Sequence, residues 1–154
     1  KGCQNNDKGN IMGLDMYLTG SKYNSTWQKK EDGSYENVDR PLLEDKYPIE
    51  SFEVELGYWR KHGDLHGMIV ETFADGVDEC QPIALSKDDL RLIIDAVKKD
   101  QLVKDHSGFF FGNSTENGSY SEESKAETIK SFELAMGFLE KDLNYRNVTY
   151  RASW

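Results

Sequence analysis

The chain has 154 residues, of which 37% are hydrophobic, 12% aromatic and 31% charged. Two separate cores would leave each half too small to bury enough apolar surface, so we expect one domain, and the aromatic content excludes a disordered chain. The net charge of −9 repels nucleic acid phosphates at long range, so we expect no direct nucleic-acid binding. The acidic surface suits either a basic partner or simple solubility.

The composition also bears on the compartment. No apolar run approaches the roughly 18 residues of a membrane helix, and the beginning shows no basic-then-apolar signal segment, so we expect a cytoplasmic protein without membrane contact. The two cysteines, Cys3 and Cys80, are too few for a disulfide framework, and we expect Cys80 to be a reduced, partly buried thiol.

Residues 1–11 differ from the rest because they are polar and have no hydrophobic periodicity. We interpret them as a disordered or non-native leader before a natural start at Met12, with residues 12–154 forming a single α+β domain. The alternative is a lipoprotein anchored through Cys3, which would need an apolar segment upstream.

The first predicted elements are strands. Leu14, Met16 and Leu18 alternate with polar residues, which is typical of a half-buried strand. The segments 23–28 and 34–38 flank an Asp-Gly turn and indicate an exposed hairpin. The two prolines within 40–48 favour a loop there.

The spacing of the apolar residues then changes from every second residue to about every fourth. Phe52, Val54 and Leu56 predict a second strand that ends at Gly57. After it, apolar residues at i, i+4 and i+8 predict a helix over 58–74.

A short strand at 83–85 precedes the clearest predicted helix. Ser86 and Asp89 form a near capping box at its start. The expected apolar side of this helix consists of Leu90, Ile93, Ile94 and Val97.

The last third of the chain contains three more predicted elements. Three phenylalanines at 109–111 lie between glycines and indicate a central strand. A third helix should begin near Ser121, and a final strand should span 147–151. The apolar positions that mark the inner face of this third helix are Ile129, Phe132, Met136 and Leu139. Strands joined by hairpins and interleaved with about three amphipathic helices predict an α+β fold with a mixed or antiparallel sheet.

The densest chemical motif spans 57–66. Backbone N–H groups at the start of a helix favour an anion, two cations would add positive charge, and an aromatic ring could stack on a ligand. We therefore predict a ligand-binding site formed by Tyr58, Trp59, Arg60, Lys61 and His66. In the alternative interpretation the aromatic residues belong to the core or its rim and the cations are solvated.

Metal and catalytic motifs are incomplete. His62 and His66 lie at i and i+4 on one helix face, and Cys80 or His106 could add a third metal ligand, but two histidines do not define a site. We expect no metal and no cofactor. No serine lies in a nucleophile elbow, and 108–112 lacks the lysine of a phosphate loop, so we assign no catalytic residue.

Three blocks of the chain resemble a family of small uncharacterised bacteriophage and prophage proteins. They are Met12-Gly13-Leu14-Asp15-Met16-Tyr17-Leu18, then Gly57-Tyr58-Trp59-Arg60-Lys61 with His66, then Gly108-Phe109-Phe110-Phe111-Gly112. The resemblance implies an accessory protein of the host bacterial cytoplasm and brings no known activity. The family often has a pair such as Ala-Asn where this chain has His62-Gly63, and this weakens the metal interpretation further.

Three functions follow as hypotheses. The first is a non-catalytic binding module that sequesters an anionic, nucleotide-like ligand to antagonise host defence. The second is an acidic protein-binding or DNA-mimicking inhibitor of a host protein. The third is an enzyme of unknown reaction with His66 as acid or base. The sequence leaves the oligomeric state open.

Overall fold

The computed structural model describes residues 13–102, 114, 118–141 and 145–154. Its elements, in chain order, are β1 (Asp15–Tyr23), β2 (Trp27–Lys29), β3 (Tyr35–Asn37), β4 (Leu42–Leu43), β5 (Tyr47–Pro48), β6 (Ser51–Arg60), α1 (Gly63–Phe73), β7 (Ile83–Ala84), α2 (Lys87–Lys98), α3 (Glu122–Glu140) and β8 (Arg146–Ser153). The predicted leader at 1–11 and the predicted strand at 109–111 lie outside the described residues.

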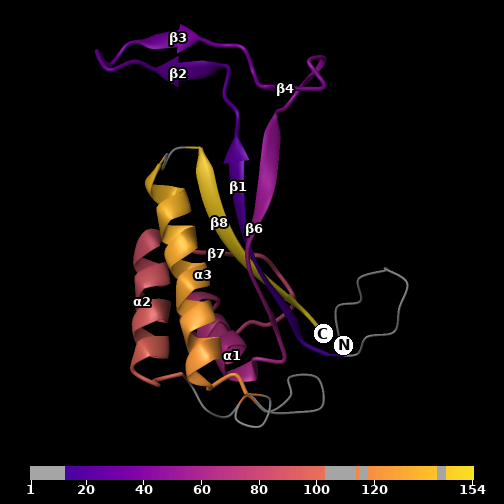
Figure 1. Cartoon of the computed structure of the whole chain (residues 1–154), viewed down its shortest axis with the longest axis vertical. Coiled ribbons are helices and arrows are strands. Elements are labelled where there is room, and N and C mark those ends of the chain that lie inside the picture. The colour runs from indigo at the N-terminus through magenta and orange to yellow at the C-terminus, as the bar shows by residue number, and fades with distance from the viewer. Residues whose placement is uncertain (1–12, 103–113, 115–117, 142–144) are drawn as a thin grey trace.

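The main sheet has the strand order β6-β1-β8-β7, and every pair of neighbours is antiparallel. With the three helices this confirms the α+β prediction, and of the two predicted sheet types it is the antiparallel one. The first strand of the chain lies between β6 and the last strand, β8 (Figure 1).

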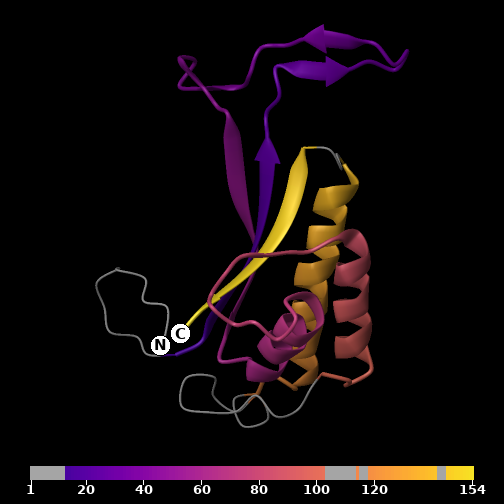
Figure 2. The ribbon, with the colours of Figure 1, turned by 180° about the vertical axis from the view of Figure 1, so that it is seen from behind.

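One face of the sheet carries the core. Met16 and Leu18 of β1 are fully buried and lie opposite Ala152 and Tyr150 of β8. The helices lie on this side (Figures 1 and 2). At Gly20 α3 comes so close that an added Cβ would lie 2.9 Å from a ring carbon of Phe138. The alternation read in the sequence thus points the apolar side of β1 toward the helices, as expected.

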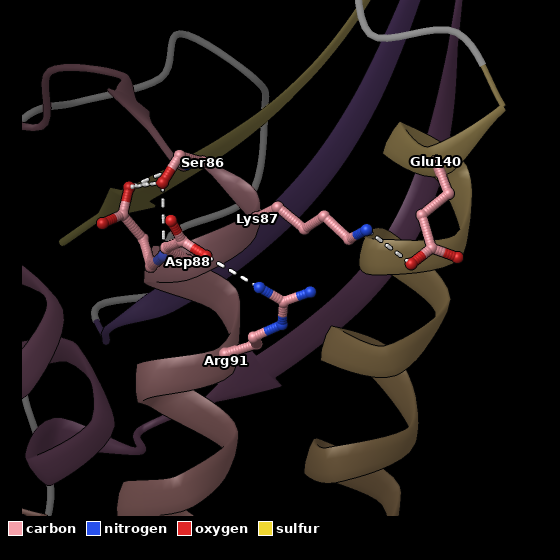
Figure 3. A network of polar contacts seen from close by, with 6 residues as sticks. Ser86, Lys87, Asp88, Arg91 and Glu140 are labelled. Carbon is pink, nitrogen blue, oxygen red and sulfur yellow. Dashed lines mark hydrogen bonds and ion pairs between the residues drawn. The ribbon is translucent and has the colours of Figure 1, made fainter.

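Helix α2 follows its prediction closely. The Ser86 hydroxyl accepts the Asp89 N–H at 3.2 Å, and the Asp89 carboxylate accepts the Ser86 N–H at 2.8 Å, which completes the capping box. All four predicted apolar residues of the helix are buried. Figure 3 shows this helix start together with an ion pair of 2.7 Å from Lys87 to Glu140, which joins α2 to α3.

The predicted helix at 58–74 is wrong at its beginning. Tyr58 and Arg60 are still strand residues, paired with Tyr17 and Asp15 of β1, and the helix begins only at Gly63. The register shifts between Leu18 and Thr19, so that Leu56 is an extra residue on β6. Such a bulge interrupts the period of two and hid the second half of the strand. Neither Arg60 nor Lys61 therefore belongs to the first turn of a helix.

Beyond the ends of the helices, β1 and β6 continue into a projecting segment, residues 24–50, which we call the arm (Figures 1 and 2). It contains the hairpins β2–β3 and β4–β5, so 40–48 is partly paired where a loop was predicted. Asn24 closes the neck of the arm, since its side chain donates to the Ile49 carbonyl at 3.0 Å and its N–H to the Glu50 carbonyl at 2.8 Å.

Two further findings concern membrane spans and the cysteines. Within the described ranges, no helix combines the length and apolar character needed to cross a membrane. Cys80 is buried as expected, but it is disulfide-bonded, which corrects the prediction of a reduced thiol. The other cysteine of the chain, Cys3, lies outside the described residues.

Candidate functional site

The candidate site is a cleft between the edge strand β6 and helix α3. Its volume is about 480 Å³. Among the described residues, those that line it are Leu56, Tyr58, Trp59, Arg60, His62, Ser119, Ser124, Glu127, Thr128, Lys130, Ser131 and Leu134. The structure therefore brings three of the five predicted site residues together, namely Tyr58, Trp59 and Arg60.

Trp59 forms the wall where the strand meets the helix. Its indole N–H donates to the Thr128 hydroxyl at 2.9 Å, and its ring stacks on Phe132 with a centroid distance of 5.2 Å and an interplanar angle of 16°. The indole lies across Gly57, where an added Cβ would come within 2.6 Å of the ring. Any residue other than glycine at this position would displace the ring or the strand.

Tyr58 is fixed in place by contacts with two residues of the neighbouring strand β1. Its hydroxyl donates to Asp15 Oδ1 at 2.5 Å, and its ring lies 5.4 Å from that of Tyr17 at a tilt of 48°. The hydrogen bond to Asp15, together with partial burial, raises the pKa of Tyr58 to about 12. At neutral pH the cleft therefore has a neutral phenol with a fixed orientation at this position.

Two cations line the cleft, Arg60 from the strand and Lys130 from the helix, against one carboxylate, Glu127. Both cations are exposed, and within the described part of the chain neither forms an ion pair. Four serine and threonine hydroxyls complete the lining, from Ser119, Ser124, Thr128 and Ser131. A surface of this composition can bind an anion through charge and hydroxyl hydrogen bonds.

His62 lies at the α1 end of the cleft and is almost fully buried. Its Nδ1 is 3.3 Å from the Ser114 hydroxyl, which also accepts the Asp64 N–H at 3.1 Å. Burial lowers the pKa of His62 to about 4, although the nearby Asp64 carboxylate opposes this shift. The imidazole is therefore neutral at physiological pH.

The other two predicted site residues lie elsewhere. Lys61 is not among the residues that line the cleft; it adopts a positive φ of 57°, its N–H donates to the Leu14 carbonyl at 2.8 Å, and its side chain lies beside Gly13. His66 is only 2% exposed and belongs to the interior of α1. The structure thus gathers the last strand residues of the predicted site in one cleft and places Lys61 and His66 outside its lining.

His66 is part of a buried hydrogen-bond chain. Its Nε2 lies 2.9 Å from Asp78 Oδ2 and its Nδ1 2.8 Å from the Tyr150 hydroxyl. Because a carboxylate only accepts, Nε2 of His66 carries a proton and donates it to Asp78. Complete burial, with the charge of Asp78, raises the pKa of Tyr150 well above its usual range. Burial opposes ionisation of Asp78, but hydrogen bonds, first of all from His66, give its carboxyl a lowered pKa.

The two histidines do not form a metal site together, because their ring nitrogens engage different partners. In the part of the chain that the structure describes, no three His, Cys, Asp or Glu side chains gather in a way that could hold a metal ion.

Sequence motifs do not reveal the contribution of α3 to the cleft. Ser124, Thr128 and Ser131 lie at i, i+4 and i+7, so they form one stripe of small hydroxyl residues along the helix. The spacing can be recognised in the sequence. It indicates part of a binding surface only when β6 is known to lie beside α3.

Comparison with known proteins adds no identification: no family model, no curated protein and no solved structure matches this chain.

Proposed function

We propose that this protein is a non-catalytic binding module that holds a small anionic, nucleotide-like ligand in the cleft between β6 and α3. The observation that carries the proposal is the convergence of Tyr58, Trp59 and Arg60 with Lys130 on one cleft. We further propose, from the resemblance to small phage proteins, that it acts as an accessory protein that sequesters such a ligand from host defence.

The dimensions of the cleft support a small ligand. Pockets for small molecules usually have volumes of roughly 300 to 1,000 Å³, and this cleft of about 480 Å³ lies within that range. This volume is of the size that a nucleotide needs.

The chemistry of the lining supports an anion. Arg60 and Lys130 contribute two positive charges against the single carboxylate of Glu127, in a protein whose net charge is −9. A local excess of cations on an acidic protein concentrates positive potential at this one place. Trp59 is stacked on Phe132 and is partly buried, whereas Tyr58 is 47% exposed beside Tyr17, so Tyr58 is the ring that a base can reach more easily.

Two observations favour binding over catalysis. His66, the residue that we considered as acid or base, uses both ring nitrogens inside the protein and is not among the residues that line the cleft. His62 lines the cleft but has its Nδ1 close to the Ser114 hydroxyl. Proton transfer requires a group within hydrogen-bonding reach of the substrate; both ring nitrogens of His66 are engaged inside the protein, and His62 could offer the cleft only its Nε2.

The proposed cytoplasmic location has one observation against it. Cys80 is disulfide-bonded, and disulfides are rare in reducing compartments. The binding proposal does not depend on the compartment, because Cys80 is not among the residues that line the cleft.

The test is calorimetric titration of the full chain against a panel of nucleotides and cyclic nucleotides. If Arg60 contacts a phosphate, Arg60→Ala should weaken binding by about 1.5 to 3 kcal/mol, or roughly ten- to hundredfold, and Lys130→Ala should weaken it in the same direction. Arg91→Ala is the matched control, because this exposed arginine pairs with Asp88 on α2, away from the cleft.

Trp59 provides a second measurement. Ligand binding should change the fluorescence of the wild type, and Trp59→Phe should remove most of that change. A wild-type protein that binds no member of the panel, or that binds one equally well with and without Arg60, contradicts the proposal and favours the acidic inhibitor of a host protein.

A further inference from the structure

The arm exposes most of its residues, and many of the exposed side chains are large and hydrophobic. Of its 27 residues, 21 are exposed, and Asn24 at the neck is the buried one. Twelve large hydrophobic side chains are exposed in the described part of the chain, and seven of them lie on the arm or at its two ends. These seven are Tyr23, Trp27, Tyr35, Leu42, Leu43, Tyr47 and Phe52. Exposed apolar side chains gathered on one projecting segment in this way indicate an interaction site.

The hairpin β2–β3 has no packed face within the described structure, since all six of its strand residues are exposed. An isolated two-stranded hairpin is only marginally stable in water, and a third strand or a covering surface is needed for it to persist. The arm therefore has both the surface and the energetic reason to bind another molecule.

The two faces of this hairpin differ in chemistry. The register pairs Trp27 with Asn37 and Lys29 with Tyr35, which places these four side chains on one face. We call this the aromatic face. The opposite face carries Gln28 and Glu36. The aromatic face thus has two rings and one cation but no carboxylate.

This composition is self-complementary. A two-fold axis brings the same patch of both copies together, so a patch suits a copy of itself only when it contains both members of each interaction. The aromatic face does, because an ammonium is attracted to the face of an aromatic ring and Lys29 lies between Trp27 and Tyr35. A basic partner would instead bring more positive charge against Lys29, on a face with no acid to receive it.

Stable interfaces use about 20 to 30 residues from each side, and the 21 exposed residues of the arm, which lie on more than one of its faces, set the upper limit to what the arm can contribute. We propose that the protein forms a two-fold dimer through its arm, with the aromatic faces of two β2–β3 hairpins packed on each other and Lys29 of each copy over an aromatic ring of the other. The cleft between β6 and α3 stays outside this interface.

The test is sedimentation velocity of the full chain over a range of concentrations up to several hundred micromolar. The wild type should form a species of about 35 kDa, twice the chain mass of 17.7 kDa. Central aromatic residues dominate interface energies, so Trp27→Ala combined with Tyr35→Ala should weaken the dimer at least tenfold. Lys29→Glu should weaken it as well.

Leu92→Ala is the matched control, because Leu92 is 48% exposed on α2 and Trp27 is 54% exposed on the arm. It should leave the dimer unchanged. Thermal unfolding of each variant checks that the body still folds. The proposal is overturned by a wild type that is monomeric throughout, including one whose arm binds a different protein, or by a dimer that Leu92→Ala weakens as much as the arm variants do.

Discussion

At the scale of single residues, Gly57 determines the shape of the cleft wall. Because the Trp59 ring lies across it, Gly57→Ala should destabilise the protein by about 1 to 3 kcal/mol, the usual cost of overpacking, and should move the indole off Thr128. Chemical denaturation gives the free energy of unfolding, and the tryptophan emission reports the ring.

A second glycine serves as the control. Gly137 lies on α3 with open space where a Cβ would be added. Gly137→Ala should stabilise the protein by roughly 0.5 to 1 kcal/mol, since alanine is the better helix former. If both substitutions shift stability in the same direction and to the same extent, the close contact of Trp59 with Gly57 is not what constrains this position.

His62 predicts a pH dependence of stability. Its pKa is lowered to about 4 in the folded protein from an ordinary value of about 6.5, so the unfolded chain takes up the proton first as the pH falls. The contribution of His62 to the free energy of unfolding is therefore complete above about pH 6.5. It is lost as the pH falls from there to 4, and the loss amounts to about 3 kcal/mol. Urea denaturation at several pH values measures the loss, and His62→Phe should remove most of it within this window.

At the scale of elements, the arm should be separable from the rest of the molecule. Tyr23 and Ser51 are direct partners at the end of the β1–β6 ladder, so an Asn-Gly turn can replace residues 24–50. We expect cooperative unfolding with a Tm within about 5 °C of the wild type, the effect of roughly 1 kcal/mol, because a single arm residue is buried. Circular dichroism during heating measures this, and collapse of the transition would show that the arm supports the core.

The elements also show what the sequence could predict. The second helix was predictable in full, because its apolar period and its Ser86–Asp89 capping box are local signals. The end of β6 was not, because the bulge at Leu56 breaks the alternation, and the pairing of Arg60 with Asp15 is a contact between distant parts of the chain. Local pattern reading lacks such information.

The residues of the candidate site divide in the same way into those that local sequence signals predict and those whose place depends on contacts between distant segments. Tyr58, Trp59 and Arg60 stood out because cations and aromatic residues cluster there in sequence. His66 was chosen for the same cluster, yet its partners Tyr150 and Asp78 lie 84 and 12 residues away, and these contacts place it in the interior. Lys130 carried no local signal at all, because its role depends on the packing of α3 beside β6.

At the scale of the whole molecule, charge is distributed in a way that argues against DNA imitation. Several carboxylates pair with lysines on the surface, for example Glu36 with Lys30 and Glu140 with Lys87. Such pairs interrupt an acidic stripe of the kind that a DNA mimic would need. The protein is instead divided into a body with a cationic cleft and an arm with an aromatic face.

The strand order has a consequence for how the chain reaches this structure during synthesis. β1 leaves the ribosome before the other strands that the structure describes, and β8, one of its two neighbours, leaves after all of them. Contacts between such distant segments form slowly, because the closure of a long loop costs entropy before any contact compensates for it. The nascent protein can pair β1 with β6 early, while the β1 edge that β8 will cover waits until β8 itself has been synthesised. Throughout that interval the chain presents an open strand edge and an unfinished core, the features that chaperones recognise and that lead to aggregation.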